Sequence, residues 1–132
     1  MIPKFRAWDK FDKEMLNVHG INYDAEGVWT KEMIDDESDG GFIYFSDIEL
    51  LQSTGLFDKN GKEIFEGDLI LTENGVEEVT FTTQNNCYGV YLQYEKMFNT
   101  PIDYYATRIS LDHIKGEIIG NKFEHPHLLG EG

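Results

Sequence analysis

The sequence predicts a mostly β protein, with an N-terminal β-hairpin arm followed by a small SH3-like barrel. Two observations favour this fold class. Short runs rich in β-branched and aromatic residues recur along the chain, and Gly- and Asn-containing turn signals separate them. The length of 132 residues lies within the range of about 100–150 typical of one compact domain. We therefore expect a single domain with an appended arm.

The N-terminal third of the chain indicates a hairpin, an acidic loop and two further strands. Residues 4–8 and 14–18 contain apolar side chains and are separated by a polar reversal at residues 9–13. Residues 35–41 combine four carboxylates with two glycines, which predicts a solvated loop. Residues 42–45 and 48–51 are apolar on both faces, so we expect buried strands. Periodicity alone leaves one turn of helix at residues 47–52 as an alternative.

The segment from Thr54 to Ile70 carries the clearest folding signal. The run Asp58-Lys59-Asn60-Gly61 lies between two apolar stretches, and Asn and Gly adopt positive φ at low steric cost. This pattern predicts a tight hairpin with positive φ at Gly61. Gly67 and Asp68 then introduce a second strand that runs to Leu71.

Strands are also predicted at residues 76–82 and 88–94, bounded by turn signals at residues 73–75 and 84–86. Strand alternation on the second run directs Tyr88, Val90, Leu92 and Tyr94 toward the core and Tyr91 outward. A last apolar alternation covers residues 109–119 and is closed by Gly120-Asn121.

The signature segment resembles the phage YopX family. The matching elements are Thr54-Gly55-Leu56, Asp58, Asn60-Gly61, Glu63-Ile64 and Glu66-Gly67-Asp68. Weaker similarity is found in the opening residues 4–9 and in the closing residues 120–129, where His125 replaces the usual Asn. The resemblance implies one YopX-like domain over residues 1–132, with arm and acidic loop at 1–53 and barrel at 54–132. It also implies a protein encoded by a phage or prophage.

Charge restricts the classes of partner. The chain has 25 acidic and 11 basic residues and a formal net charge of −14, which repels phosphate backbones and anionic membranes. We therefore expect no direct nucleic-acid binding and no membrane binding. A single cysteine, Cys87, and the absence of a signal-like or membrane-spanning apolar run favour a cytosolic location, and the resemblance implies that this is the cytoplasm of a bacterial host.

No pattern in the sequence indicates catalysis, a cofactor or a metal centre. Asp58, Asn60, Glu63, Glu66 and Asp68 offer oxygen ligands, but their spacing differs from that of a calcium-binding EF-hand and fits turn chemistry better. His113, His125 and His127 lack the spacing and the thiolate partners of a structural zinc site. Ser and Cys residues lie in no recognisable nucleophile context. We expect a protein that is not an enzyme.

The predicted activity is binding of a protein partner, by a non-enzymatic accessory protein that could also form homo-oligomers. Exposed aromatic side chains and an acidic surface are the features that favour this function. Trp8 is expected to be buried, and Trp29 is a further aromatic residue outside the predicted barrel. The candidate partner-binding residues are Asp35, Asp36, Glu37, Asp39, Tyr91, Tyr104 and Tyr105. One alternative is an acidic DNA mimic that inhibits a nucleic-acid-binding enzyme, and a second is a metal-assisted enzyme.

Overall fold

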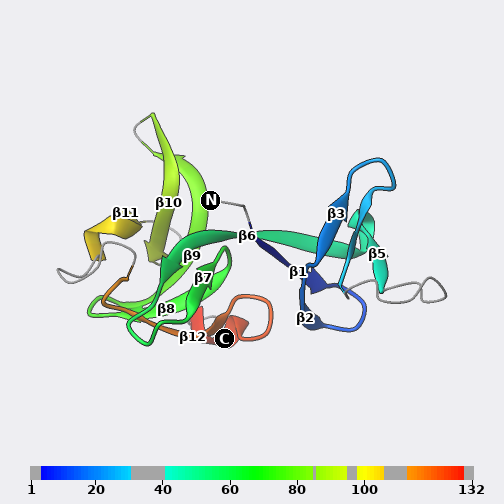
Figure 1. Ribbon diagram of the computed structural model, residues 1–132. Coiled ribbons are helices and arrows are strands. Elements are labelled where there is room, and N and C mark those ends of the chain that lie inside the picture. Colours follow the sequence, from blue (N-terminus) through cyan, green and yellow to red (C-terminus); the bar gives the residue numbers. More distant parts are fainter. Residues whose placement is uncertain (1–3, 31–40, 85, 95–97, 106–112, 130–132) are drawn as a thin grey trace. The chain divides into compact units, whose positions relative to one another are not determined.

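The computed structural model describes residues 4–30, 41–84, 86–94, 98–105 and 113–129 (Figure 1). Contacts divide the chain into two compact units, which we call the N-terminal unit (Met1–Gln52) and the C-terminal unit (Ser53–Gly132). Strands dominate both units, which confirms the predicted mostly β class. Within the described residues, the helical elements are three short 3-10 turns: η1 (Phe45–Asp47), η2 (Ile102–Tyr105) and η3 (Pro126–Leu129). None of the described helices has the length and apolar character needed to span a bilayer.

The N-terminal unit begins with the predicted hairpin. Strand β1 (Phe5–Asp9) pairs antiparallel with β2 (Glu14–Asn17) on one side and with the first half of β6 (Ile48–Phe57) on the other. The polar reversal closes because the Asp9 carboxylate accepts hydrogen bonds from the backbone amides of Phe11 and Asp12. Residues 48–52 are therefore strand rather than helix, which agrees with the favoured interpretation of this segment.

A second, three-stranded sheet completes this unit. Its order is β3 (Gly20–Asn22), β4 (Gly27–Trp29), β5 (Phe42–Tyr44). The first two strands were not predicted from the sequence, because three-residue strands that contain glycine carry little propensity signal. Val28 of β4 packs with Ala7 and Ile48 in a small core that belongs to this unit alone. The predicted division of one domain into an arm of residues 1–53 and a barrel of residues 54–132 stays a prediction.

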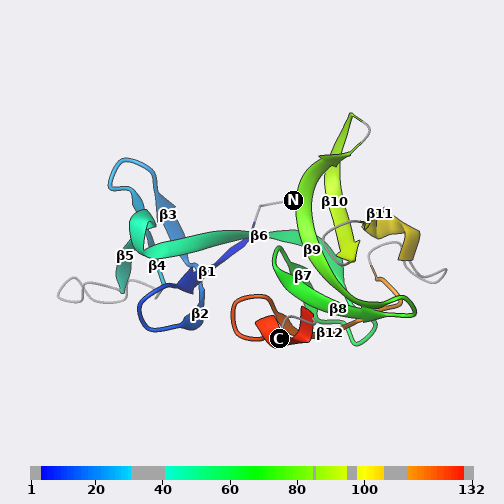
Figure 2. The same ribbon diagram turned by 180° about the vertical axis from the view of Figure 1, so that it is seen from behind.

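The C-terminal unit is a curled half-barrel. Five antiparallel strands follow the order β11 (Phe98–Pro101), β10 (Cys87–Tyr94), β9 (Gly75–Gln84), β8 (Asp68–Thr72), β12 (Glu117–Asn121). Figures 1 and 2 show β9 and β10 bending together as one long hairpin. Strand β7 (Glu63–Phe65) pairs with the second half of β6 across the signature turn. The core of this unit contains Ile64, Ile70, Val79, Leu92, Ile102, Tyr105 and Ile114.

Three aromatic residues differ from the exposure that the sequence predicted. Tyr91 was expected to face solvent but is only 6% exposed, whereas Tyr88, expected in the core, is 72% exposed. Exposure on β10 follows position along the strand rather than alternation, since Tyr91 and Leu92 in its middle are both buried and Cys87 and Tyr88 near the hairpin tip are both exposed. The Tyr91 hydroxyl donates a hydrogen bond to the carbonyl of Cys87. Tyr44, expected in a buried strand, is 58% exposed.

Candidate functional site

The signature segment has a structural role. Asp58 is buried, and its Oδ1 atom accepts hydrogen bonds from the backbone amides of Asn60 and Lys62 at 2.9 Å each. Gly61 has φ +83°, which confirms the predicted hairpin conformation. Asp68, also buried, accepts a hydrogen bond from the backbone amide of Phe65. These carboxylates close turns, which agrees with the interpretation of the segment as turn chemistry.

The closing motif is held in the same way. The Asn121 side chain is buried, accepts hydrogen bonds from the amides of Phe123 and Glu124, and donates one to the Glu124 carboxylate. The Nδ1 atom of His125 accepts a hydrogen bond from the Asn121 amide at 3.2 Å. An Asn side chain at position 125 would offer a comparable acceptor oxygen, which explains why His serves at this place.

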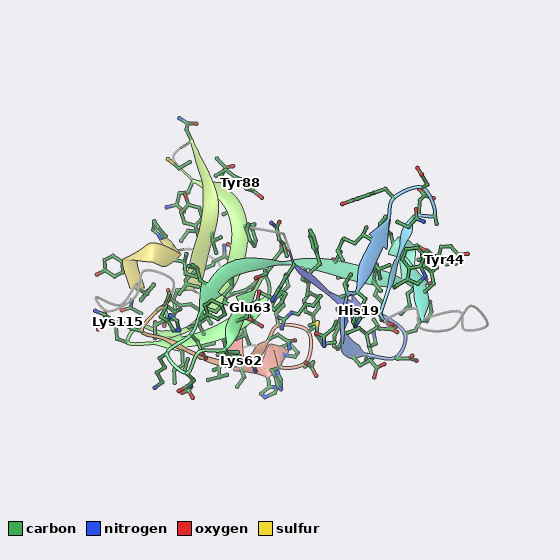
Figure 3. The ribbon with its side chains drawn as sticks, viewed as in Figure 1. His19, Tyr44, Lys62, Glu63, Tyr88 and Lys115 are labelled. Atoms are coloured by element: carbon green, nitrogen blue, oxygen red, sulfur yellow. The ribbon has the colours of Figure 1, made fainter. Side chains whose placement is uncertain are left out.

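An aromatic surface covers one face of the β3–β4–β5 sheet. Trp29 and Phe42 are cross-strand partners with ring centroids 5.1 Å apart, and Phe42 contacts Tyr44 edge to face at 5.3 Å. The intervening residues Val28 and Ile43 belong to the core of the N-terminal unit, so the three rings lie on the opposite side of the sheet. We call Trp29, Phe42 and Tyr44 the aromatic face. Figure 3 shows Tyr44 at this sheet.

Gly27 makes room for the aromatic face. A Cβ atom at this position would lie 2.4 Å from Cζ of Phe42 and 2.5 Å from the carbonyl oxygen of Ile43. The Phe42 ring therefore lies directly against the backbone of β4. The arrangement depends on a residue without a side chain, and close approach of this kind is a standard use of glycine.

A shallow pocket adjoins Tyr44 in the same unit. It has a volume of about 190 Å³ and is lined by Glu26, Tyr44, Phe45 and Ser46. The Phe45 ring is in turn 6.2 Å from that of Tyr23, which is 74% exposed. The aromatic face thus continues into a concave region with a carboxylate at its rim.

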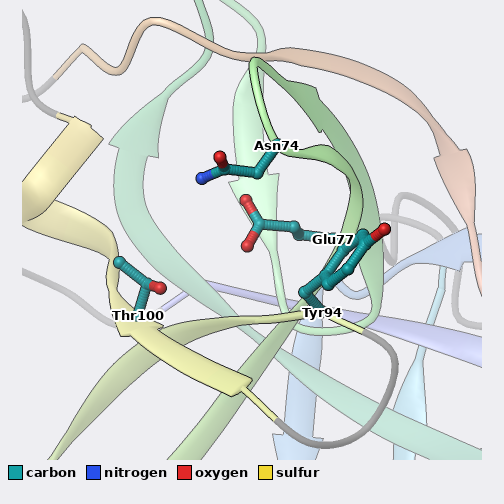
Figure 4. Close-up of a pocket in the computed structure, with 4 residues that line it drawn as sticks. All are labelled: Asn74, Glu77, Tyr94 and Thr100. Atoms are coloured by element: carbon teal, nitrogen blue, oxygen red, sulfur yellow. The ribbon is translucent and has the colours of Figure 1, made fainter.

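A second pocket lies in the C-terminal unit and contains a buried charge. Its volume is about 350 Å³, and its lining residues are Asn74, Glu77, Tyr94 and Thr100 (Figure 4). We call it the Glu77 pocket. Glu77 is 1% exposed, and its Oε2 atom accepts hydrogen bonds from the hydroxyls of Thr72 and Tyr105 at 2.8 Å each. The Tyr105 oxygen accepts a further hydrogen bond from the Asn74 amide at 3.0 Å.

Burial, together with the hydrogen bond to Glu77, raises the pKa of the Tyr105 phenol above its ordinary value. The phenol therefore keeps its proton throughout the physiological range and remains a donor to the Glu77 carboxylate. Both hydroxyls donate to the same oxygen of that carboxylate. The network holds the side chain of Glu77 in a fixed orientation toward the pocket.

The predicted partner-binding residues fall into three groups. Tyr104 is 69% exposed on η2 and stays a candidate, whereas Tyr91 and Tyr105 are buried and cannot serve as surface anchors in this structure. Asp35, Asp36, Glu37 and Asp39 lie outside the described residues. The burial expected for Trp8 is confirmed.

The histidines and one acidic cluster have side chains of types that bind metals in proteins. His113 stacks on Phe57 at 5.4 Å, and His125 and His127 lie with ring centroids 6.2 Å apart. In the described part of the chain, carboxylate oxygens come close enough to share a cation at Asp9, Asp12 and Glu14. The Asp9 carboxylate is already engaged by two turn amides, so the cluster is explained by the β1–β2 reversal.

Sequence reasoning missed the two surfaces that the fold creates. Phe42 and Tyr44 resembled a buried strand, and the alternating exposure could have been inferred only with the pairing of β4 and β5 known. Glu77 lies beside Glu78 in a predicted strand, and nothing in the local sequence distinguishes the two residues. Its partners Thr72 and Tyr105 are 5 and 28 residues away, and no local pattern connects them.

Comparisons with known proteins agree with the sequence resemblance. The sequence model of a protein family, described as YopX protein, matches residues 4–130 of this chain. The structure is similar to the crystal structure of protein EF1440 from Enterococcus faecalis, with a TM-score of 0.68 and 28% sequence identity over 98% of this chain and 99% of that chain. No curated protein sequence matches the chain.

Proposed function

This chain belongs to the YopX family, and we propose that it is a non-enzymatic accessory protein that binds a protein partner through the aromatic face. The observation that carries the proposal is the set of three rings, Trp29, Phe42 and Tyr44, gathered on the side of the sheet opposite the core. Aromatic residues are enriched among the anchors of protein interfaces, because they bury a large area and lose little conformational entropy.

The glycine beneath the rings supports a binding role. A side chain at position 27 would strengthen a strand by ordinary propensity, yet Gly27 leaves the space in which Phe42 lies against the backbone. The outer residue, Tyr44, remains more than half exposed and lines the shallow pocket. A rigid aromatic platform next to a concave region is a common arrangement for anchoring a peptide segment.

Charge favours a basic partner. The net charge of −14 attracts cationic surfaces and speeds their encounter with the protein. The acidic residues Asp35, Asp36, Glu37 and Asp39 belong to the connection between β4 and β5, the two strands that carry the aromatic face. Connectivity therefore links the acidic segment directly to the proposed contact surface.

We also propose a cellular location and a genetic origin for the protein. Family membership and the similar structure from Enterococcus faecalis support a role in bacteria. We place the protein in the bacterial cytoplasm, encoded by a phage or prophage and acting on a basic host or phage protein. The DNA mimic and the metal-assisted enzyme are not proposed, because no specific observation in the described residues favours them.

A capture experiment with matched variants tests the proposal. Wild-type protein, Tyr44→Ser and Tyr88→Ser are immobilised and exposed to a lysate of the bacterial host, and bound proteins are identified by mass spectrometry. Both tyrosines are exposed, but only Tyr44 belongs to the aromatic face. We expect a basic protein that is retained by wild type and Tyr88→Ser and lost with Tyr44→Ser. Equal retention by all three would contradict the proposal.

A kinetic measurement on the captured partner tests the role of charge. Neutralising Asp35, Asp36, Glu37 and Asp39 to amide or Ser counterparts should slow association more than it speeds dissociation, because peripheral charges mainly steer encounter. An association rate that is indifferent to these substitutions and to salt would remove the acidic segment from the interface.

A further inference from the structure

The Glu77 pocket holds a charged group where a small β domain would ordinarily place an apolar one. Glu77 lies on β9, its neighbour Val79 on the same face belongs to the core, and its own side chain is 1% exposed. Removing a carboxylate from water without a cation is costly, and an apolar residue of similar size would stabilise the core at least as well. Packing alone therefore does not explain why a glutamate occupies position 77.

The hydrogen bonds of Glu77 satisfy one side of the carboxylate only. Both donors, the hydroxyls of Thr72 and Tyr105, reach Oε2. Among the residues that the structure describes, none donates a hydrogen bond to Oε1, and no Lys, Arg or His forms an ion pair with Glu77. Figure 4 shows the carboxylate directed into the space between Asn74 and Thr100. Oε1 is thus the carboxylate oxygen without a hydrogen-bond donor among the described residues.

The remaining lining residues suit a planar organic cation. Tyr94 contributes an aromatic ring, on which a guanidinium can stack. Asn74 uses its amide nitrogen to bond Tyr105, which leaves its side-chain oxygen as an acceptor, and Thr100 adds a hydroxyl. The volume of about 350 Å³ exceeds that of a guanidinium group with its adjoining methylenes.

We infer that the Glu77 pocket is a binding site for a guanidinium group, supplied by an arginine side chain of a bound peptide or protein. The carboxylate provides the counter-charge at Oε1, Tyr94 provides the stacking surface, and the Thr72–Tyr105–Asn74 network keeps Glu77 in place. Arginine fits better than lysine because its flat, multiply donating head group can bond the carboxylate and stack at the same time. This site lies in the C-terminal unit and does not depend on the aromatic face.

Titration with small probes, followed by NMR of the nitrogen-labelled protein, tests the inference. The probes are N-acetyl-arginine methylamide, the lysine analogue, and the neutral citrulline analogue, which keeps the shape of the arginine head group without its charge. We expect saturable shifts of the backbone amides of residues 74–77, 94 and 100 with the arginine probe. Affinity should lie on the order of millimolar, and it should be weaker by about tenfold for the lysine probe and for the citrulline probe. Equal affinity for arginine and citrulline, or for arginine and lysine, would overturn the inference.

Matched variants separate the pocket from general charge effects. Glu77→Gln should weaken the arginine probe by about tenfold, whereas Glu73→Gln, which removes the same charge from an exposed position four residues earlier, should leave it unchanged. Because Glu77→Gln can also disturb the fold, Thr100→Phe provides a second route: it fills the pocket and leaves the Glu77 network intact. Unchanged binding of the arginine probe to folded Thr100→Phe would place the probe elsewhere and contradict the site.

Discussion

The Oδ2 atom of Asp58 accepts a hydrogen bond from the backbone nitrogen of Ile118 at 3.0 Å, and the two residues are 60 positions apart. The same carboxylate bonds two amides of its own turn through Oδ1. Asp58 therefore connects the β6–β7 hairpin to β12, which is the last strand of the half-barrel sheet. This dual role gives a physical reason for an Asp at this position of the signature.

Replacing Asp58 with Ala should destabilise the protein by about 2–4 kcal/mol, because three buried or partly buried amide donors lose their acceptor. Urea denaturation followed by circular dichroism measures the change. Glu73→Ala, at an exposed turn position, serves as the control and should shift the free energy of unfolding by less than about 0.5 kcal/mol. Similar midpoints for the two variants would show that the Asp58 bonds contribute little.

Gly61→Val should destabilise the protein by about 1 kcal/mol or more, through backbone strain at a β-branched residue. Gly61 has φ +83°, and no heavy atom lies within 4 Å of the position that a Cβ would occupy, so the Cβ itself meets no neighbour. Gly61→Asn is the matched variant, since Asn adopts positive φ more readily. We expect the midpoint of chemical denaturation to fall in the order Gly, Asn, Val, and equal midpoints for Asn and Val would refute the strain argument.

Gly27→Ala should cost about 1–3 kcal/mol, because the added methyl group meets the Phe42 ring and the rigid backbone oxygen of Ile43. The substitution should also alter the near-ultraviolet circular dichroism of the aromatic face, where Trp29 packs on Phe42. Gly89→Ala is the control, because a Cβ at position 89 would meet no heavy atom within 4 Å. If Gly27→Ala matched Gly89→Ala in both measurements, the result would contradict the close packing of the Phe42 ring against the backbone of β4.

The buried phenol of Tyr105 predicts a pH dependence. Its pKa in the folded protein is raised by burial and by Glu77, so the folded state holds this proton more tightly than the unfolded state does. The resulting stabilisation is complete below the unfolded pKa of about 10 and is lost as pH rises toward the folded pKa. The difference in unfolding free energy between wild type and Tyr105→Phe should be constant from about pH 7 to 9 and should fall above about pH 10. If the difference in unfolding free energy grew with pH instead, the prediction would be contradicted.

Local signals in the sequence predicted the hairpins and most strands. The run from Asp58 to Gly61 encodes its own turn, because side chain and backbone bond within five residues. The strands β8, β9 and β10 follow from β-branched and aromatic runs between turn residues. The N-terminal hairpin was predicted for the same reason, and its turn is again closed by an Asp, Asp9.

Features that depend on pairing and curvature could not be predicted from the sequence. Alternation predicted that Tyr91 faces solvent, but Tyr91 and its neighbour Leu92 are both buried, although successive side chains of a strand point to opposite faces. The aromatic face requires the register that sets Trp29 opposite Phe42. The Glu77 pocket requires contacts among residues separated by up to 31 positions, as for Asn74 and Tyr105. Contacts between residues so far apart in the chain leave no local pattern in the sequence.

Site-specific photo-crosslinking tests the proposed binding function most directly. A benzophenone amino acid is introduced at position 44 on the aromatic face, or at position 88 on the exposed tip of the β9–β10 hairpin, and the protein is irradiated in host lysate. The account predicts a discrete covalent adduct with a basic protein from position 44 and none of that mass from position 88. The same adduct in equal yield from both positions, or no adduct from position 44, would contradict binding through the aromatic face.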